Sequence, residues 1–511
     1  MAEQPKATGA GRGVLYIAFA KFYFMFAGLI VQFRLPAILS HVSWGSYSLV
    51  NSFVSPVNNV LVTGTIQTVS KFAAAEPDKA RRVQQAALRM HVRVGLLVAI
   101  AFVALAPVVA TLEGDMSKTA PLMLAGMIVA GNAFYATFVG TANGLHQFHK
   151  QAGLDITFAT VRSAGLIGMA MAGLGVIGVV GGWVAAVGVI LVLAATWVGL
   201  PGAVPTEQRL PVKPMVRYFV GVAIYLALFN ALMFVDTWLL KRFTTDYFAA
   251  RGDADPSALA DVQVGYYAAV QNLARLSYQA IIAATFVVFP LVSRSTFTED
   301  RDTTKRYVEI TTRYSLAFAA AIAVVMAGEP TEVLGLVYAP DYAQLGGPAL
   351  ALLAIGNVAF SVFAIAGTIL NGAGKTGAAI ATAAVTLVLA IAGNAIAIPI
   401  ATGSGHALEA AAGVTAGAMI VGAVLTGLAL RRAIGAFVPA ASAVRVAIAA
   451  GVAIAVGRVL PLHGKLLALV AAAAIGVVFV AVLVATRELG RRDLEVIKAV
   501  RAKRGAGGGD V

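Results

Sequence analysis

The chain has 511 residues, of which 59% are hydrophobic and 12% are charged. Soluble domains carry about 25% charged residues, so the composition excludes a soluble globular protein and indicates an integral membrane protein. The absence of cysteine excludes disulfides and thiolate metal sites, and the net charge of +14 is distributed as a membrane-topology signal rather than as a nucleic-acid surface.

Fourteen stretches are apolar enough to cross a membrane, which requires about 20 residues per helix. The uncharged run from Ser163 to Thr206 is too long for one helix, so we divide it at Gly173-Leu174-Gly175. In chain order, we expect spans at 13–38, 46–69, 94–112, 120–142, 154–174, 176–198, 217–240, 264–292, 312–328, 346–370, 376–399, 409–430, 442–460 and 466–486.

Lysine and arginine concentrate in the cytoplasmic loops of membrane proteins. If the N-terminus is cytoplasmic, the outer loops hold few of the 38 basic residues, namely Lys118, Lys241, Arg242, Arg251, Arg458 and Lys465. The first span is too long for a cleavable signal peptide and is interrupted by Lys21. We therefore expect a multi-pass membrane protein with both termini in the cytoplasm.

The sequence contains an internal repeat. The second span begins Gly45-Ser-Tyr47 and the eighth begins Gly265-Tyr-Tyr267, while Asn143-Gly144 and Asn371-Gly372 follow the fourth and tenth spans. Matching elements six spans apart predict two six-helix lobes in the same orientation. Transporters built from two such halves bind substrate between them, near the bilayer midplane.

This repeat predicts the domain organisation. In chain order we expect a cytoplasmic N-terminus (1–12), an N-lobe with spans one to six (13–200), a cytoplasmic linker (201–216), a C-lobe with spans seven to twelve (217–430), spans thirteen and fourteen (431–486), and a basic cytoplasmic tail that we expect to be disordered (487–511).

The eighth predicted span, Val264 to Val292, carries Arg275 near its middle. A cation at the bilayer centre costs roughly 3 kcal/mol on insertion scales, so we expect either a negative ligand or an internal partner. Gln271, Asn272 and Gln279 lie on the same side of this helix at about 100° per residue. The pattern predicts a polar stripe that faces something other than lipid.

A second polar stripe follows one helical face of the second span and comprises Ser48, Asn51, Ser52, Ser55, Asn58 and Asn59. Among these, Asn51, Ser55 and Asn58 are candidates for substrate binding. The alternative is that these side chains only form hydrogen bonds between helices. Because the second span is the repeat counterpart of the eighth, the two stripes favour a shared aqueous cavity.

Three further residues are candidates for substrate contact or gating. Lys21 lies within reach of a cavity open to the cytoplasm, although its ammonium group could instead extend to the inner membrane surface. Asp236, which follows Asn230 in the seventh span, is expected to pair or to take up a proton. We expect Asp236 and Arg34 to pair across the outer opening while the protein faces inward; the alternative is a static salt bridge.

The sequence shows no catalytic or metal-binding signature. Gly372-Ala-Gly374-Lys375-Thr376 lacks the first glycine of a phosphate-binding loop and lies between two membrane helices. His146 and His149 have no third ligand nearby in the sequence. We therefore expect a transporter rather than an enzyme, with no metal and no cofactor; coupling to H⁺, Na⁺ or the membrane potential is left open.

Several motifs resemble one transporter family. Thr63-Gly64-Thr-Ile-Gln-Thr-Val-Ser70-Lys71-Phe72 resembles the end of the second helix of polysaccharide-biosynthesis flippases of the sporulation-stage-V type, which belong to the multidrug/oligosaccharidyl-lipid/polysaccharide exporter superfamily. Phe289-Pro290-Leu-Val-Ser293-Arg294 is similar to its second-half counterpart, and Thr368-Ile-Leu370-Asn371-Gly372-Ala-Gly374-Lys375-Thr376 is similar to the segment between the tenth and eleventh helices.

The resemblance implies an all-α membrane protein with about 14 transmembrane helices, arranged as two parallel-repeat lobes in a V plus two C-terminal helices. It also implies a cavity lined by spans 1, 2, 7 and 8, and movement of an isoprenoid-pyrophosphate-linked oligosaccharide, such as one on undecaprenyl pyrophosphate, to the outer leaflet by alternating access. The partners would be the lipid-linked glycan, membrane lipids and polysaccharide assembly machinery of the cell envelope.

In that setting, Arg275 and Lys21 would bind phosphate, and amides and hydroxyls would bind sugar. Two other functions share the superfamily, an ion-coupled multidrug extruder and a lipid II flippase. Drug extrusion favours acidic cavities, whereas Lys21, Arg34 and Arg275 favour an anion. The motif-rich first helices of the lipid II branch are not found here, which favours a polysaccharide repeat unit.

Overall fold

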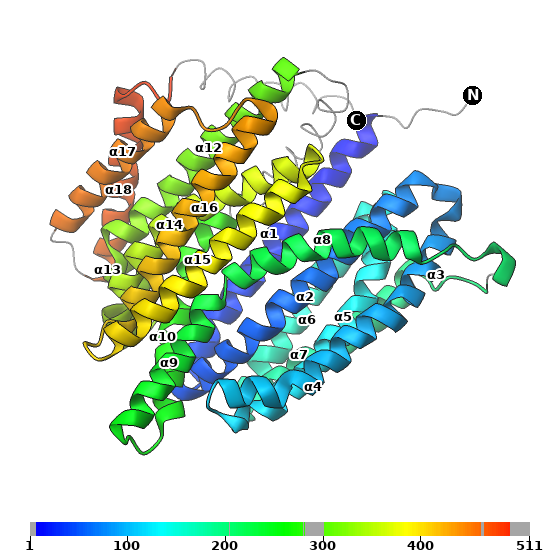
Figure 1. Cartoon of the computed structure of the whole chain (residues 1–511), viewed down its shortest axis with the longest axis horizontal. Helices are drawn as coiled ribbons and strands as arrows, with labels where there is room; N and C mark the ends of the chain where they lie inside the picture. Colours follow the sequence, from blue (N-terminus) through cyan, green and yellow to red (C-terminus); the bar gives the residue numbers. More distant parts are fainter. Residues whose placement is uncertain (1–6, 204, 280, 282–300, 461–463, 491–511) are drawn as a thin grey trace. The chain divides into compact units, whose positions relative to one another are not determined.

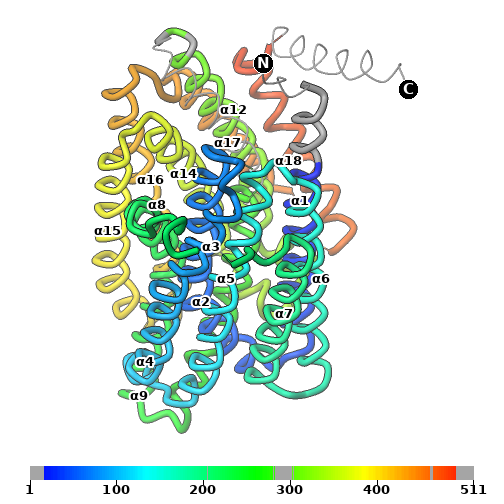
Figure 2. Tube along the Cα trace, turned by 90° about the vertical axis from the view of Figure 1, so that its right-hand side faces the viewer, coloured from blue at the N-terminus to red at the C-terminus, as the bar shows by residue number. Residues whose placement is uncertain are grey.

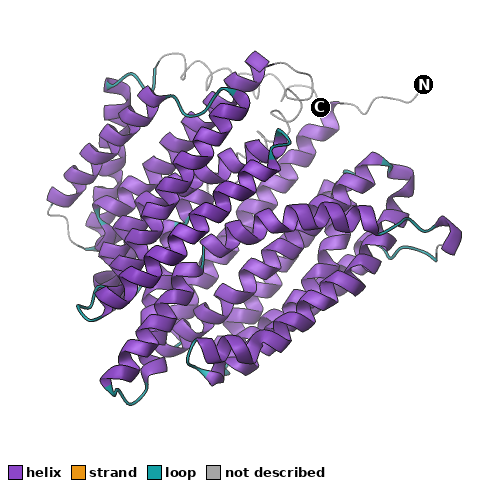
Figure 3. Cartoon of the chain, viewed as in Figure 1, coloured by secondary structure: helices purple, strands orange, loops and turns teal. Residues whose placement is uncertain are grey.

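The computed structural model describes residues 7–203, 205–279, 281, 301–460 and 464–490. In this part of the chain the regular secondary structure is helical and no strand occurs (Figure 3). The motif from Phe289 to Arg294, most of the second half of the predicted eighth span and the end of the basic tail lie outside the described residues.

The structure consists of long helices joined by turns and loops (Figure 1). Their bounds are α1 (Ala7–Ile38), α2 (His41–Ala75), α3 (Ala80–Met90), α4 (Leu96–Leu112), α5 (Thr119–Gly144), α6 (Phe148–Met171), α7 (Gly175–Val198), α8 (Lys213–Leu232), α9 (Val235–Arg251), α10 (Pro256–Ala274), α12 (Arg301–Gly328), α13 (Pro330–Gly335), α14 (Pro340–Gly372), α15 (Thr376–Thr402), α16 (Ala407–Ile434), α17 (Ala440–Val459) and α18 (Lys465–Ala485).

Twelve helical segments of the described chain are long and apolar enough to cross a membrane. The predicted number of fourteen is not confirmed: α2 is long enough but its Ser and Asn residues make it less apolar, and the eighth predicted span continues outside the described residues. Large apolar side chains such as Leu97, Ile100 and Leu105 on α4 are exposed, as expected for a surface in contact with lipid. The chain is a multi-pass, all-α membrane protein.

The chain divides into two compact units. Unit 1 comprises Met1–Asn272, Val337–Ala349 and Thr376–Ala418, and unit 2 comprises Leu273–Leu336, Leu350–Lys375 and Met419–Val511. Most candidate residues fall in unit 1.

Helices of unit 1 approach one another closely through small residues. α2 packs along α5, α1 along α6, and α6 along α7 (Figure 2). At the crossing of α6 and α7, a Cβ on Gly165 would lie 2.6 Å from the carbonyl oxygen of Gly182, and a Cβ on Gly182 would likewise meet Gly165. Such contacts drive helix association in lipid, where no hydrophobic effect is available between helices.

The predicted seventh span is not one helix. α8 ends at Leu232, Met233 and Phe234 form a turn, and α9 begins at Val235. No glycine or proline marks this break. Asp236 lies in the first turn of α9, where the positive end of the helix dipole favours a carboxylate, and this acid is the local sequence signal for a new helix start.

The eighth predicted span also differs from the structure. α10 begins earlier than predicted, at Pro256, where Asp255 caps it by accepting a hydrogen bond from the Ala258 backbone N–H. α10 ends at Ala274, Arg275 lies in a turn, and residues 276–279 are helical again. Arg275 therefore lies at an interruption of the helix rather than in its regular interior.

The linker after α7 is attached to α3, the amphipathic helix of unit 1. Arg81 donates hydrogen bonds to the carbonyl oxygens of Val198 and Gly199, which end α7, and Arg89 donates to the carbonyl oxygen of Leu210. Cations satisfy the unpaired carbonyls at helix C-termini. These arginines are thus part of the link between α7 and α8.

In unit 2, Glu488 ties α18 to α12 and α17. Its buried carboxylate forms ion pairs with Arg313 at 2.6 Å and with Arg445 at 3.3 Å. Burial alone would raise the pKa of Glu488, but hydrogen bonds from Arg313 and Ser442 outweigh burial, and the pKa is lowered. The apolar contact beneath it includes Val324, Ala449 and Phe479.

Gly165→Val should destabilise unit 1, because the added side chain would meet the Gly182 carbonyl. Overpacking of this kind costs about 1–3 kcal/mol, and we expect the midpoint of thermal unfolding in detergent to fall by a few degrees or more. Gly168→Val, on the same helix with no atom within 4 Å of the added Cβ, is the matched control. Equal unfolding midpoints for the two variants would contradict this account of the crossing.

Candidate functional site

The first group of candidate residues surrounds Asp236 on α9, whose side chain is 1% exposed. The Tyr267 hydroxyl donates to Oδ2 at 2.7 Å, and the Gln271 amide donates to Oδ1 at 2.9 Å. The Thr237 backbone N–H also donates to Oδ1, at 2.8 Å. Three donors aimed at one carboxyl group match an ionised acid, which can only accept hydrogen bonds.

The polar face of α2 meets α8 and α9. Asn230 on α8 donates to Asn59 Oδ1 at 3.2 Å, and Trp238 on α9 donates to the Ser52 hydroxyl at 2.9 Å. The rings of Trp238 and Phe53 are stacked, with centroids 5.0 Å apart. The predicted stripe on α2 therefore faces α8 and α9, and part of it forms hydrogen bonds between helices.

Three residues of that stripe, Asn51, Ser55 and Asn58, are candidates for substrate binding. Two of them, Asn51 and Ser55, contact each other. The Ser55 hydroxyl donates to Asn51 Oδ1 at 2.9 Å. Asn58 is half-buried, and its amide oxygen has no hydrogen-bond partner within the described residues. Asn58 thus keeps an acceptor available on this face.

On α10, the predicted stripe is divided between two neighbours. Gln271 contacts Asp236, as above, whereas the Asn272 amide donates to Gln32 Oε1 on α1 at 2.8 Å. Gln279 and Arg275 follow in unit 2, where both side chains are half-buried. Unit 1 therefore brings together Asp236, Gln271 and, through α2, Asn230.

Lys21 has a protein partner that the sequence analysis did not assign to it. Its ammonium group forms an ion pair with Asp155 on α6 at 2.8 Å, while 41% of its side chain is exposed. Asp155 faces α1 because α1 packs along α6. Further along α6, Arg162 lies over the Trp183 ring of α7, 4.2 Å from its centroid.

The predicted pair between Asp236 and Arg34 is not formed among the described ion pairs. Arg34 lies in the last turns of α1 with an exposed side chain, whereas Asp236 is buried against α10. Being near the outer ends of two spans did not place the two side chains together. A role of either residue in gating stays a prediction.

The two repeat motifs contact each other reciprocally, at the start of α2 and along α10. A Cβ on Gly45 would collide with the carbonyl oxygen of Asp261. A Cβ on Gly265 would lie 3.3 Å from the carbonyl oxygen of His41. In the repeat, Gly45 corresponds to Gly265 and His41 corresponds to Asp261. Each glycine therefore lies against the carbonyl group of the residue that precedes the other glycine by four positions.

Next to this contact lies a buried ion cluster that was not predicted, since the sequence indicates only that Lys118 and Lys241 are basic residues of outer loops. Lys118 forms ion pairs with Asp115 and Asp261, both at 2.6 Å, and Lys241 forms one with Asp261 at 2.9 Å. Ser257 donates to Asp115 at 2.7 Å and accepts from Lys241 at 2.8 Å. The cluster joins the turn between α4 and α5 to α9 and α10, which lie at the same end of unit 1 (Figures 1 and 2).

Two acids of this turn have shifted pKa values, in opposite directions. Burial alone would raise the pKa of Asp115, but hydrogen bonds from Lys118, Ser117 and Ser257 outweigh burial and hold it well below its usual range. Burial raises the pKa of Glu113 to about 8, and Lys241 and Arg242 offset this only in part. Glu113 is therefore mostly protonated at neutral pH, whereas Asp115 is ionised.

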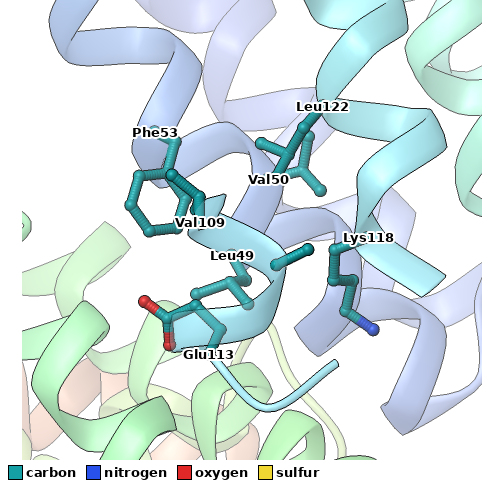
Figure 4. Close-up of a pocket in the computed structure, with 8 residues that line it drawn as sticks. Leu49, Val50, Phe53, Val109, Glu113, Lys118 and Leu122 are labelled. Carbon is teal, nitrogen blue, oxygen red and sulfur yellow. The ribbon is translucent and has the colours of Figure 1, made fainter. Parts of the chain in front are cut away.

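Glu113 and Lys118 border a narrow apolar crevice (Figure 4). The crevice has no room for a water molecule. Its other walls come from α2, α4 and α5, namely Leu49, Val50, Phe53, Val109, Ala110 and Leu122. Among the described residues, no group of His, Asp and Glu has the arrangement of a metal site.

The comparisons with known proteins agree with this architecture. A family model described as polysaccharide biosynthesis protein matches residues 10–296. The lipid II flippase MurJ in an inward closed conformation superimposes with a TM-score of 0.74 at 12% identity, covering 93% of this chain and 99% of that chain.

Two further solved structures are similar. The Vibrio cholerae MATE transporter VcmN in the bent form has a TM-score of 0.56 at 14% identity, covering 84% of this chain and 98% of that chain. A transporter of the MOP superfamily from Pyrococcus furiosus, described as having a binding pocket of reversed polarity, has a TM-score of 0.59 at 12% identity, with 83% and 95% covered. No curated protein matches.

The match of the family model covers more than half of the chain and includes the Thr63–Phe72 motif. These solved structures, a flippase and two transporters, share the fold of this chain. The chain is a member of the polysaccharide biosynthesis protein family.

Proposed function

We propose that the protein moves an isoprenoid-pyrophosphate-linked oligosaccharide, a polysaccharide repeat unit, from the inner to the outer leaflet of the bacterial inner membrane by alternating access. The observation that carries the proposal is membership in a polysaccharide-biosynthesis family on a fold shared with a lipid II flippase. Both termini would lie in the cytoplasm, and the turn between α4 and α5 would then lie outside.

The residues around the polar face of α2 suit the sugar part of such a substrate. Asn51, Ser55 and Asn58 present amide and hydroxyl groups there, and Gln271 and Asn272 add amides from α10. Neutral hydrogen-bonding groups bind hydroxyls without requiring a counter-charge. Ser55 already donates to Asn51, Gln271 to Asp236 and Asn272 to Gln32, so substrate binding would replace these bonds.

The residues proposed for the diphosphate are Arg275 and Lys21. Arg275 lies at the helix interruption after α10, and a planar guanidinium binds phosphate oxygens through two parallel hydrogen bonds. Lys21 is bonded to Asp155, but its exposed fraction leaves it accessible. A diphosphate would compete with Asp155 for this cation.

Asp236 is proposed as the coupling residue. Its carboxylate is held by donors from α9 and α10, so a proton or sodium ion that binds there would replace one of these contacts. Binding would thereby change how α9 and α10 are joined. Whether H⁺, Na⁺ or the membrane potential drives transport is decided by the ion dependence.

The test of the function is depletion of the protein in its host, followed by localisation of lipid-linked sugars. The proposal expects undecaprenyl-linked oligosaccharide to accumulate on the inner leaflet. If drug accumulation changes while lipid-linked sugars remain normally distributed, the protein is a multidrug extruder instead. If peptidoglycan precursor accumulates alone, it is a lipid II flippase.

Arg275→Ala should reduce transport of the lipid-linked sugar by at least about tenfold, because a charge-assisted hydrogen bond contributes about 1.5–3 kcal/mol. Arg275→Lys should recover part of the activity, since it keeps the charge but loses the planar fork. The measurement is the outer-leaflet fraction of lipid-linked sugar in proteoliposomes at equal protein content. Arg432→Ala, an exposed site on α16, is the control, and equal rates for both Ala variants would reject a phosphate contact.

Asp236→Asn should abolish the dependence of transport on a sodium gradient, or on a pH gradient imposed with the pH at the outer face held constant, because the amide does not bind a cation in place of the carboxylate. The measurement is the transport rate in proteoliposomes with and without each gradient. Asp246→Asn changes an exposed acid on the same helix, which pairs with Arg242, and should leave the dependence intact. A gradient response that survives in Asp236→Asn would exclude this residue as the coupling site.

A further inference from the structure

The ion cluster at the end of unit 1 carries no net charge. We call Asp115, Lys118, Lys241 and Asp261, together with Ser257, the outer latch. Its two carboxylates balance its two ammonium groups, and Ser257 bridges Asp115 and Lys241. Lys241 is 0% exposed, Asp261 is 1% exposed and Lys118 is 5% exposed. A further ionised group beside this neutral cluster would have no counter-ion within it.

Glu113 is that further group. Its side chain is 6% exposed, and its buried Oε2 has no hydrogen-bond partner within the described part of the chain. The charged groups that face it are Lys241 and Arg242 from α9 and Asp261 from α10. Arg242 is occupied elsewhere, since it donates to the Leu112 carbonyl and pairs with Asp246.

The crevice beside Glu113 is lined mainly by apolar side chains and has no room for a water molecule (Figure 4). A buried carboxylate oxygen without a donor disfavours the ionised form, whereas a protonated carboxyl group is tolerated. A proton on Glu113 is therefore a condition for this turn to pack as it does.

Opening of this end would reverse those conditions. In an outward-open state, the turn between α4 and α5 would separate from α9 and α10, and water would reach the carboxyl group. A hydrated glutamic acid has an ordinary pKa near 4.5, so it would lose its proton at neutral pH. The closed state then binds one more proton than the open state.

We propose that Glu113 is the proton-binding residue of the outer latch, protonated while the α4–α5 turn is packed against α9 and α10, and ionised once the latch opens to water. The proposal rests on the transport cycle put forward above. It assigns to this site a ligand, the external proton, that favours closure of the outer side after the cargo has left.

The sign of the pH effect follows from the proton balance. Because the closed state binds the additional proton, lower pH favours closure, and the ratio of open to closed protein rises by up to tenfold per pH unit. The window runs from about pH 4.5, the usual value for a glutamic acid, to about 8, the raised value in the closed state. Above that window Glu113 is ionised in both states and the ratio levels off.

The experiment uses the full-length protein in lipid nanodiscs and measures the proton and the opening separately. Infrared difference spectra between about pH 6 and pH 9 should show one protonated carboxyl band that is lost as the pH rises. Because the chain has no cysteine, spin labels can be attached at Met116→Cys and Ala254→Cys, two exposed sites on either side of the latch. The longer label distance should gain population over the same pH range.

Glu113→Gln should remove the infrared band and hold the labels at the short distance at both pH values, since glutamine imitates the protonated acid. Glu207→Gln, at an exposed site, is the matched control and should leave both signals unchanged. Glu113→Asp keeps a titratable group and should shift the midpoint rather than abolish it. A band or a pH-dependent distance that persists in Glu113→Gln overturns the proposal.

Neither readout requires glycan. If both signals behave as expected but depletion leaves the distribution of lipid-linked sugars normal, the latch assignment is supported and the proposed substrate is rejected. If depletion causes lipid-linked sugars to accumulate on the inner leaflet while both signals are absent, the proposed substrate is supported and the latch assignment is rejected.

Discussion

Asp261 joins the two halves of the sequence repeat through both its backbone and its side chain. Its carbonyl oxygen lies against Gly45 of α2, and its carboxylate pairs with Lys118 and Lys241. Ion pairs this deeply buried contribute little net stability when complete, but removing one partner leaves an uncompensated charge that costs about 3–5 kcal/mol. The arrangement is therefore sensitive to any motion that separates α4–α5 from α9–α10, which is what a gate requires.

Asp236 and Glu113 show how surroundings set the state of a buried acid. Asp236 has three donors and lies in the first turn of α9, where the helix dipole also favours negative charge. Glu113 has an oxygen without a donor and a dry apolar crevice beside it. The same functional group accepts three hydrogen bonds at one site, whereas at the other it has an oxygen without a donor beside an apolar crevice.

Much of the fold was accessible from the sequence because hydropathy reports directly on lipid contact. The spans that became α5, α7, α15 and α18 needed no tertiary information, and the repeat was visible in Gly45 and Gly265. The repeat contact itself was not predictable, since it depends on two helices crossing at those glycines. The break before Val235 was also not predicted. Mean hydropathy over a window of about 20 residues does not reveal a short turn, and Asp236 is the only local sequence signal for it.

Site residues were harder to predict than spans, because a side chain takes its partner from a neighbouring helix whose rotation the sequence does not state. Lys21 was predicted to reach a cavity open to the cytoplasm, but its partner Asp155 comes from α6. Asp236 and Arg34 were joined by counting residues along their helices, which gives depth but not direction. The structure resolves direction, and Asp236 faces α10 instead.

The outer latch also explains basic residues that do not follow the cytoplasmic bias of lysine and arginine. In the proposed topology with cytoplasmic termini, Lys118, Lys241 and Arg242 would lie on the side where lysine and arginine are disfavoured. Each has a specific acceptor there: Asp261 for the two lysines, and the last carbonyl of α4 for Arg242. Charges that are buried and paired contribute little to the attraction between a loop and the cytoplasm, so the chain can keep them outside without reversing its orientation. Three of the six exceptions to the charge bias, Lys118, Lys241 and Arg242, are thus residues that hold this end of unit 1 together.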